Sequence, residues 1–137
     1  MSRIYHVFVS HSWDHVDDLK NLRDLLENRS YFKVEFEEVP PHDPIDSSNS
    51  SYVKTVLKKK ILGSDIVLGI AGLYASYSNW MDWELDTAKS NEIPIIGVIP
   101  RGQEHISKVV YSKSIVDVRW NTESIVDAIR TYAKNEN

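Results

Sequence analysis

The sequence predicts an α/β protein in which a five-stranded parallel sheet lies between helices on both faces, as a three-layer sandwich. Segments with helical spacing of apolar residues alternate with short runs rich in β-branched and aromatic residues. Two of these runs, residues 65–72 and 93–99, are almost continuously apolar, which is typical of parallel strands buried on both faces. Such alternation predicts a parallel sheet covered on each side.

The first half of the chain alternates strand and helix twice. Residues 5–9 predict a strand, and the following segment predicts a helix because its apolar residues recur at helical spacing: Val16, Leu19, Leu22, Leu25 and Leu26. Residues 31–36 predict the second strand. Residues 37–49 hold three prolines and almost no apolar periodicity, so we expect a long loop of the kind that often carries function. A helix then begins at Ser50 or Ser51.

The second half continues the alternation with three strands and three helices. A strand at residues 65–72 is followed by a loop and by a helix at about residues 80–90. The strand at 93–99 ends at Pro100, and a short helix is expected near residues 104–111. Residues 114–120 predict the last strand, and a helix from residue 122 to about 134 follows. With 137 residues and no internal linker, we expect one domain over residues 1–137.

Composition argues against several classes of protein. The chain has 16 basic and 20 acidic residues and a net charge of −4, which argues against electrostatic binding of nucleic acid. It has no cysteine, so thiolate nucleophiles and cysteine-based zinc sites are excluded. No stretch approaches the roughly 20 apolar residues of a membrane helix, and no signal peptide is evident. We therefore expect a cytoplasmic protein that binds neither nucleic acid nor membrane.

Ligands in open parallel sheets bind beyond the carboxyl ends of the strands, where the strand order reverses. The segments expected at that edge are residues 10–13, the 37–49 loop and the 71–79 loop. Two groups of residues there include side chains that bind metals in other proteins. His11 and His15 are four residues apart, but His11 is expected to precede the helix. The acidic and histidine side chains of the long loop are common in solvated turns, so no metal site is expected.

Glu84 does not fit the pattern of its own helix. At helical spacing it shares a face with four apolar or aromatic residues, namely Tyr77, Trp80, Met81 and Ala88. A buried, unpaired carboxylate is costly, and burial raises its pKa. Periodicity leaves two readings open. Glu84 could pair with a Lys or Arg at the edge of this face, or it could be a functional carboxylate at the rim of an apolar cleft.

Three features together resemble the TIR family. The strand ending in residues 8–12 (FVSHS) resembles the first TIR signature, and Trp80 to Glu84 (WMDWE) resembles the Trp-x-x-x-Glu signature after the third strand. The long second loop lies where TIR domains carry their BB loop. The resemblance covers nearly the whole chain and implies a flavodoxin-like arrangement. Within the family the chain looks most like stand-alone bacterial antiphage-defence proteins, such as the TIR subunit of Thoeris systems.

The resemblance implies cleavage of NAD at the nicotinamide–ribose bond, with Glu84 in the place of the catalytic glutamate. NAD is then a substrate, and no cofactor is expected. The product would be ADP-ribose or a cyclic or conjugated form of it, and a separate effector protein would sense it. The resemblance also implies homo-oligomers formed through TIR–TIR contacts.

The expected chemistry accounts for a single carboxylate. Ordinary glycosidases need two, one of which protonates a poor leaving group. Nicotinamide is already cationic in NAD and leaves as a neutral molecule, so no general acid is required. One carboxylate can hold the ribose hydroxyls and offset the positive charge that develops on the ribosyl ring.

The remaining candidates are substrate-binding residues, each with a structural alternative. Ser10 and Ser12 could bond phosphate or ribose, or serve a turn. His11 could contact the ligand or line the rim. Trp13 and Trp80 could stack on adenine or nicotinamide, or pack in the core. Asp46, in the long loop, completes the set of binding candidates, whereas Trp83 falls off the Glu84 face and is expected to pack.

Two other functions compete with NAD cleavage. A non-catalytic TIR scaffold would act by self-assembly, because a fold alone does not determine function. It would need no carboxylate on the Glu84 face. A nucleoside deoxyribosyltransferase-like enzyme would also use a glutamate on an α/β sheet.

Overall fold

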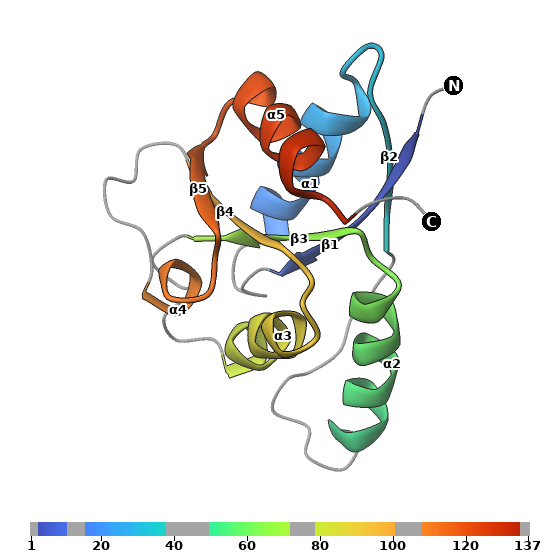
Figure 1. The fold of residues 1–137 in the computed structure, drawn as a ribbon, viewed down its shortest axis with the longest axis vertical. Coiled ribbons are helices and arrows are strands. Elements are labelled where there is room, and N and C mark those ends of the chain that lie inside the picture. The colour runs from blue at the N-terminus through green and yellow to red at the C-terminus, as the bar shows by residue number, and fades with distance from the viewer. Residues whose placement is uncertain (1–2, 11–15, 38–49, 72–78, 101–107, 135–137) are drawn as a thin grey trace.

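A computed structural model of the chain describes residues 3–10, 16–37, 50–71, 79–100 and 108–134. These residues confirm the predicted class: five parallel strands form one sheet in the order β2-β1-β3-β4-β5 (Figure 1). The elements in chain order are β1 (Ile4–Ser10), α1 (Val16–Glu27), β2 (Lys33–Phe36), α2 (Ser50–Leu62), β3 (Ile66–Ile70), α3 (Asn79–Ser90), β4 (Ile95–Ile99), α4 (Lys108–Tyr111), β5 (Val116–Arg119) and α5 (Thr122–Tyr132).

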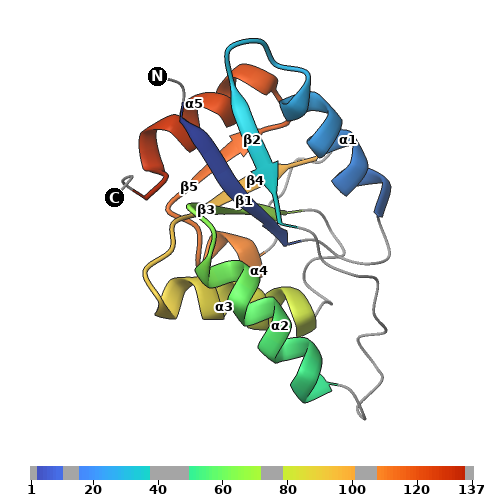
Figure 2. The same cartoon turned by 90° about the vertical axis from the view of Figure 1, so that its right-hand side faces the viewer.

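Helices cover both faces of the sheet. Helices α1 and α5 lie on one face, and α2, α3 and α4 lie on the other (Figures 1 and 2). Alternate strand residues face the two layers, as the pleat requires. In β1, Val7 and Val9 pack toward α1 and α5, whereas Phe8 packs toward α2 and α3. Ser10 has the parity of Phe8 and therefore points toward the layer that contains α3.

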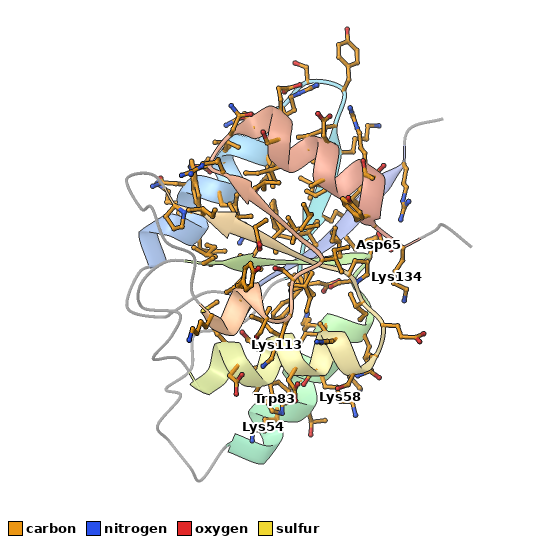
Figure 3. The ribbon with its side chains drawn as sticks, turned by 60° about the vertical axis from the view of Figure 1, so that its left-hand side comes forward. Lys54, Lys58, Asp65, Trp83, Lys113 and Lys134 are labelled. Carbon is orange, nitrogen blue, oxygen red and sulfur yellow. The ribbon has the colours of Figure 1, made fainter. Side chains whose placement is uncertain are left out.

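The third and fourth strands are shorter than their apolar runs predicted. Asp65 precedes β3 and is not part of it. Its side chain links this segment to β1, because Oδ2 accepts a hydrogen bond of 2.9 Å from the backbone N–H of His6. Its carbonyl also accepts one of 2.9 Å from the N–H of Lys134, which brings the end of α5 beside it (Figure 3). Ile93 is buried but still follows the turn that ends α3, where Glu92 has a φ of 61°. An apolar run therefore marks burial and overestimates the length of the strand.

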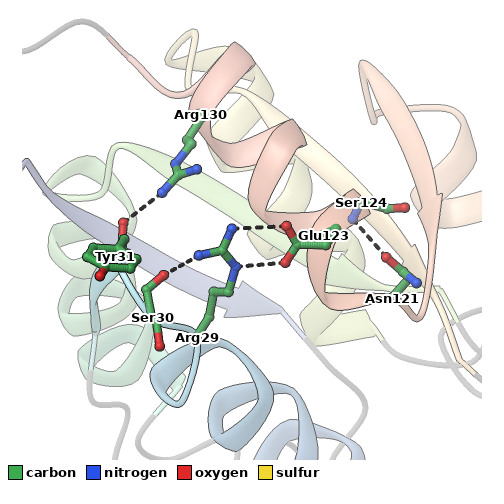
Figure 4. Close-up of polar contacts among 7 residues, drawn as sticks. All are labelled: Arg29, Ser30, Tyr31, Asn121, Glu123, Ser124 and Arg130. Carbon is green, nitrogen blue, oxygen red and sulfur yellow. Dashed lines mark hydrogen bonds and ion pairs between the residues drawn. The ribbon is translucent and has the colours of Figure 1, made fainter.

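The second strand begins at Lys33 and not at Tyr31, so that prediction was wrong at its first residues. Tyr31 adopts a left-handed φ of 60° and its side chain is exposed. Two arginines hold this turn against α5 (Figure 4). Arg130 Nη2 donates 2.7 Å to the carbonyl of Tyr31, and Arg29 bonds both carboxylate oxygens of Glu123 at 2.7 and 2.9 Å. The composition around Tyr31 favours a strand, but these contacts with α5 hold the segment in a turn.

Helix α5 begins where the sequence predicts. Asn121 is its N-cap, with extended backbone and a side-chain oxygen that accepts from the N–H of Ser124 at 3.0 Å. Such a cap satisfies one of the free donors of the first turn. No helix within the described ranges is long and apolar enough to cross a membrane.

Candidate active site

Ser10 and Glu84 meet beneath the sheet at its carboxyl edge. Ser10 is the last residue of β1, and Glu84 lies in the second turn of α3. Ser10 Oγ donates a hydrogen bond of 2.7 Å to Glu84 Oε1, and both side chains are buried. Strand β1 lies between β2 and β3, which is where the strand order reverses. The pair therefore occupies the position at which open α/β sheets bind ligands.

Helix α3 approaches the sheet closely because the strand beside Ser10 carries a glycine. Gly69 of β3 is in register with Ser10 and belongs to the same face. A Cβ added at Gly69 would lie 3.4 Å from Leu85 Cδ2 and 3.4 Å from Val110 Cγ1, so side chains of α3 and α4 occupy the space that a larger residue would take. A glycine inside a strand often marks such a close approach. This approach helps to bring Glu84 within reach of Ser10.

The buried face of α3 confirms the predicted position of Glu84. Met81, Leu85 and Ala88 are fully buried on the same side of the helix. Glu84 itself is only 4% exposed. Burial raises the pKa of Glu84 to about 8, and the hydrogen bond from Ser10 opposes that rise. A carboxyl in this setting holds its proton near neutrality and becomes a strong acceptor once ionised.

The alternative reading, an ion pair that neutralises Glu84, finds no support in the described part of the chain. There, Glu84 forms no salt bridge, and its hydrogen-bond partner is the hydroxyl of Ser10. Within the same set of residues, the second carboxylate oxygen, Oε2, has no hydrogen-bond partner. The site is thus a carboxyl group with one oxygen held by the protein.

Neighbouring helices hold α3 in place at two points. Lys113, which follows α4, donates 3.3 Å to the carbonyl of Asp82 and also contacts the carboxylate of that residue. On the other side, Lys54 of α2 lies over the ring of Trp83 with its Nζ 5.7 Å from the ring centroid (Figure 3). Trp83 is partly buried against the α2–α3 core, so its predicted packing role is confirmed.

The other predicted binding residues fall outside what the structure describes. His11, Ser12, Trp13 and Asp46 lie outside the described residues, as do the histidines and acids weighed as metal ligands. Trp80 lies in the first turn of α3, and its side chain is outside the described set. In the described ranges, no group of three or more His, Asp or Glu side chains is arranged to hold a metal ion.

The sequence pattern did not point to two residues that help to position α3 and its Glu84, namely Gly69 and Lys113. Gly69 interrupts an otherwise apolar strand, which is a recognisable signal of close packing. Lys113 follows a short helix and carries no signal of its own, because its contact with Asp82 depends on how α3 and α4 lie together.

Comparison with protein families gives a match that includes the candidate site. The model of the family described as "Thoeris protein ThsB, TIR-like domain" matches residues 8–105, which include both Ser10 and Glu84. A search of curated protein sequences found no significant match.

Solved structures share the fold at low sequence identity. A 2-deoxyribosyltransferase from Bacillus psychrosaccharolyticus matches with a TM-score of 0.61 and 17% identity, covering 96% of this chain and 99% of that one. The CMP N-glycosidase BcmB of Clostridium botulinum matches with a TM-score of 0.55 and 12% identity over 91% and 98% of the two chains. The flavoenzyme FerB, an NAD(P)H:acceptor oxidoreductase from Paracoccus denitrificans, matches with a TM-score of 0.53 and 14% identity over 96% and 99%. At these identities the likeness is one of fold.

Proposed function

The chain belongs to the TIR-like domain family of the Thoeris protein ThsB, and from that premise we propose that it cleaves NAD at the nicotinamide–ribose bond in antiphage defence. The observation that carries the proposal is the buried carboxyl of Glu84 at the carboxyl edge of the sheet, with Oε1 held by Ser10. A carboxylate with a strongly perturbed pKa at a ligand-binding edge is a recurrent feature of active sites.

The reaction needs one carboxylate. The bond from ribose C1′ to the nicotinamide nitrogen breaks, and its electron pair leaves with neutral nicotinamide. Ionised Glu84 would hold the ribose hydroxyls through Oε2 and stabilise the positive charge left on the ribosyl ring. Attack by water gives ADP-ribose, attack by a group of the same molecule gives a cyclic product, and attack by another molecule gives a conjugate. We propose that a separate effector protein senses the product.

The positive charge on the nicotinamide ring of NAD would control whether Glu84 is ionised. With a pKa of about 8, the carboxyl is mostly protonated near pH 7 in the free protein. A cationic nicotinamide at about 5 Å would favour the ionised form by roughly 3 kcal/mol at an effective dielectric constant of about 20. That corresponds to a fall of about two pKa units. Glu84 would therefore ionise when the cationic nicotinamide ring binds beside it, and NADH, whose nicotinamide ring is neutral, would leave it protonated.

The test compares Glu84→Gln with wild-type protein, using mass spectrometry to follow nicotinamide release from NAD. Glu84→Gln keeps the size of the side chain and its ability to accept from Ser10, so the variant is expected to fold and to lose nicotinamide release. Asp86→Asn is the matched control, because it removes an exposed acid from the same helix. Undiminished turnover by Glu84→Gln would overturn the assignment of Glu84.

The wild-type protein should also be assayed with extract from phage-infected cells and after forced oligomerisation through a fused assembly domain. Family resemblance implies TIR–TIR contacts, and an enzyme of this kind can depend on assembly. Absence of nicotinamide release under all of these conditions would favour the non-catalytic scaffold.

A second candidate is N-glycosidic cleavage of nucleosides or nucleotides. Two structures of the same fold carry the names 2-deoxyribosyltransferase and CMP N-glycosidase, and both names describe chemistry at a nitrogen–sugar bond. Deoxynucleosides with a free base, and CMP alone, should be assayed beside NAD. Base exchange or release of cytosine, with NAD left intact, would favour this candidate.

A further inference from the structure

We infer that Ser10 is a positioning residue for Glu84, holding Oε1 so that Oε2 is directed to the ribose of the substrate. The inference rests on the proposed function, because it concerns the same carboxyl. Its basis is the hydrogen bond of 2.7 Å from Ser10 Oγ to Glu84 Oε1 between two buried side chains.

The hydroxyl of Ser10 has a single proton to donate. In the structure it is directed to Glu84, so it is not available to a phosphate or ribose oxygen while the bond persists. Ser10 is also fully buried and is the last residue of a strand paired on both sides, with Lys33–Phe36 on one side and Ile66–Gly69 on the other. A donor on a rigid strand is suited to orient a neighbouring group.

The bond differs from the turn or cap role that serines commonly have. Ser64, the other buried serine of the described chain, shows that role: its Oγ donates 2.8 Å to the carbonyl of Lys60, four residues earlier in the helix. Ser10 instead reaches a side chain 74 positions away. The local backbone gains nothing from this bond, and the position of the carboxyl depends on it.

Within the described residues, the hydrogen bond from Ser10 is the polar interaction that shifts the pKa of Glu84. The acidic, basic and histidine side chains on the elements packed against α3 are His6 on β1, the lysines of α2, Lys108 of α4 and Lys113 after α4. Helix α3 itself carries Asp82, Asp86 and Lys89. The pKa of Glu84 is shifted by burial and by Ser10, and by none of these charges. Removing the hydroxyl should therefore raise the pKa of Glu84 further.

The experiment compares Ser10→Ala with Ser64→Ala, which deletes a buried hydroxyl that only serves the backbone. Two readouts separate positioning from a structural role. The first is the titration of the Glu84 carboxyl carbon by NMR, assigned with Glu84→Gln and recorded without NAD. The second is the pH profile of NAD cleavage. Ser10→Ala is expected to move both midpoints to higher pH, while Ser64→Ala leaves both unchanged.

The kinetic effect should fall on kcat. Loss of a hydrogen bond to a charged group is expected to lower kcat about 10- to 100-fold, with KM changed by less than about threefold. An increase in KM alone would overturn the inference in favour of direct substrate binding by Ser10. Adding Ser10→Ala to Glu84→Gln should lower the residual activity no further, since Ser10 acts through the carboxylate.

Failure of the inference and failure of the proposed function are distinguishable. If NAD is not cleaved by wild-type protein, the NAD assignment fails while the titration still decides whether Ser10 controls Glu84. An unchanged carboxyl titration in folded Ser10→Ala overturns the inference whatever the substrate is. Circular dichroism shows whether that variant folds. Should it not fold, Ser10→Cys offers a substitute of similar size with a much weaker donor, and the same shift of the midpoint is expected.

Discussion

Ser10 Oγ lies 2.7 Å from Glu84 Oε1, although the two residues are 74 positions apart in the chain. One ends the central strand β1, and the other lies on the inner face of α3. The contact accounts for a carboxyl that is 4% exposed in an otherwise apolar layer. A buried carboxyl is tolerated when it is protonated or hydrogen-bonded. Glu84 meets both conditions, since burial raises its pKa and Ser10 donates a hydrogen bond to it.

The stability of the protein should fall as pH rises from about 4.5 to about 8. Glu84 holds its proton more tightly in the folded chain, with a pKa of about 8, than at its ordinary value of 4.5. Its contribution is therefore fully present below about pH 4.5 and is lost as pH rises through about 8, by a few kcal/mol in total. Urea unfolding between pH 4 and 9 measures it. Glu84→Gln lacks this titration, so parallel pH profiles for the two proteins would contradict the prediction.

The pH dependence of NAD cleavage should differ between kcat/KM and kcat. The first reports the free protein and the second the bound complex. The ionised carboxylate is the active form, so activity rises with pH through the pKa of Glu84, which is about 8 in the free protein. The cationic nicotinamide ring of NAD lowers that pKa, and the midpoint for kcat is expected about two pH units lower. Steady-state rates from pH 5 to 10 measure both midpoints, and coincident midpoints would speak against charge coupling.

Gly69→Val should displace α3 and reduce activity. A Cβ at this position already lies 3.4 Å from Leu85 and Val110, and the branched methyls of valine have no room without movement of α3 or α4. Overpacking of this kind costs about 1–3 kcal/mol. Urea unfolding and nicotinamide release measure the two effects. Gly69→Ala is the control, with an effect on both quantities smaller than that of valine. Equal behaviour of the two variants would show that α3 tolerates the extra volume.

Gly97→Ala should destabilise the fold through a different contact, with Asp117 on β5. The added Cβ would lie 2.2 Å from Asp117 Oδ1, so the carboxylate would have to leave its hydrogen bond of 2.6 Å with Ser114. We expect a loss of about 1–2 kcal/mol in the free energy of unfolding. In an Asp117→Ala background the same glycine substitution should cost measurably less, because the nearest atom is gone and Val110 Cγ1, 3.0 Å from the added Cβ, remains as the close contact. Additive losses in the double variant would exclude this contact as the cause.

Local patterns in the sequence predict the class and most elements of the fold. Alternating helical and strand periodicities predicted five parallel strands with helices on both faces, and the described residues bear this out. The errors lie at the ends of elements. Tyr31 has a composition suited to a strand, but Arg29 and Arg130 hold its segment in a turn. Such contacts come from distant helices, and local periodicity carries no information about them.

For the candidate site, too, one part follows from the sequence and another part only from the tertiary structure. Helical spacing alone placed Glu84 on an apolar face, since the positions that share a face of a helix follow from its geometry. Which group would meet the carboxyl there was left open between a Lys or Arg and a ligand. Tertiary structure decided it: the register of β1 with β3, the parity of Ser10 and the close approach of α3 over Gly69 bring a hydroxyl to Glu84. Burial is likewise a property of the assembled layers, and within the described residues it is what raises the pKa of this carboxyl to about 8.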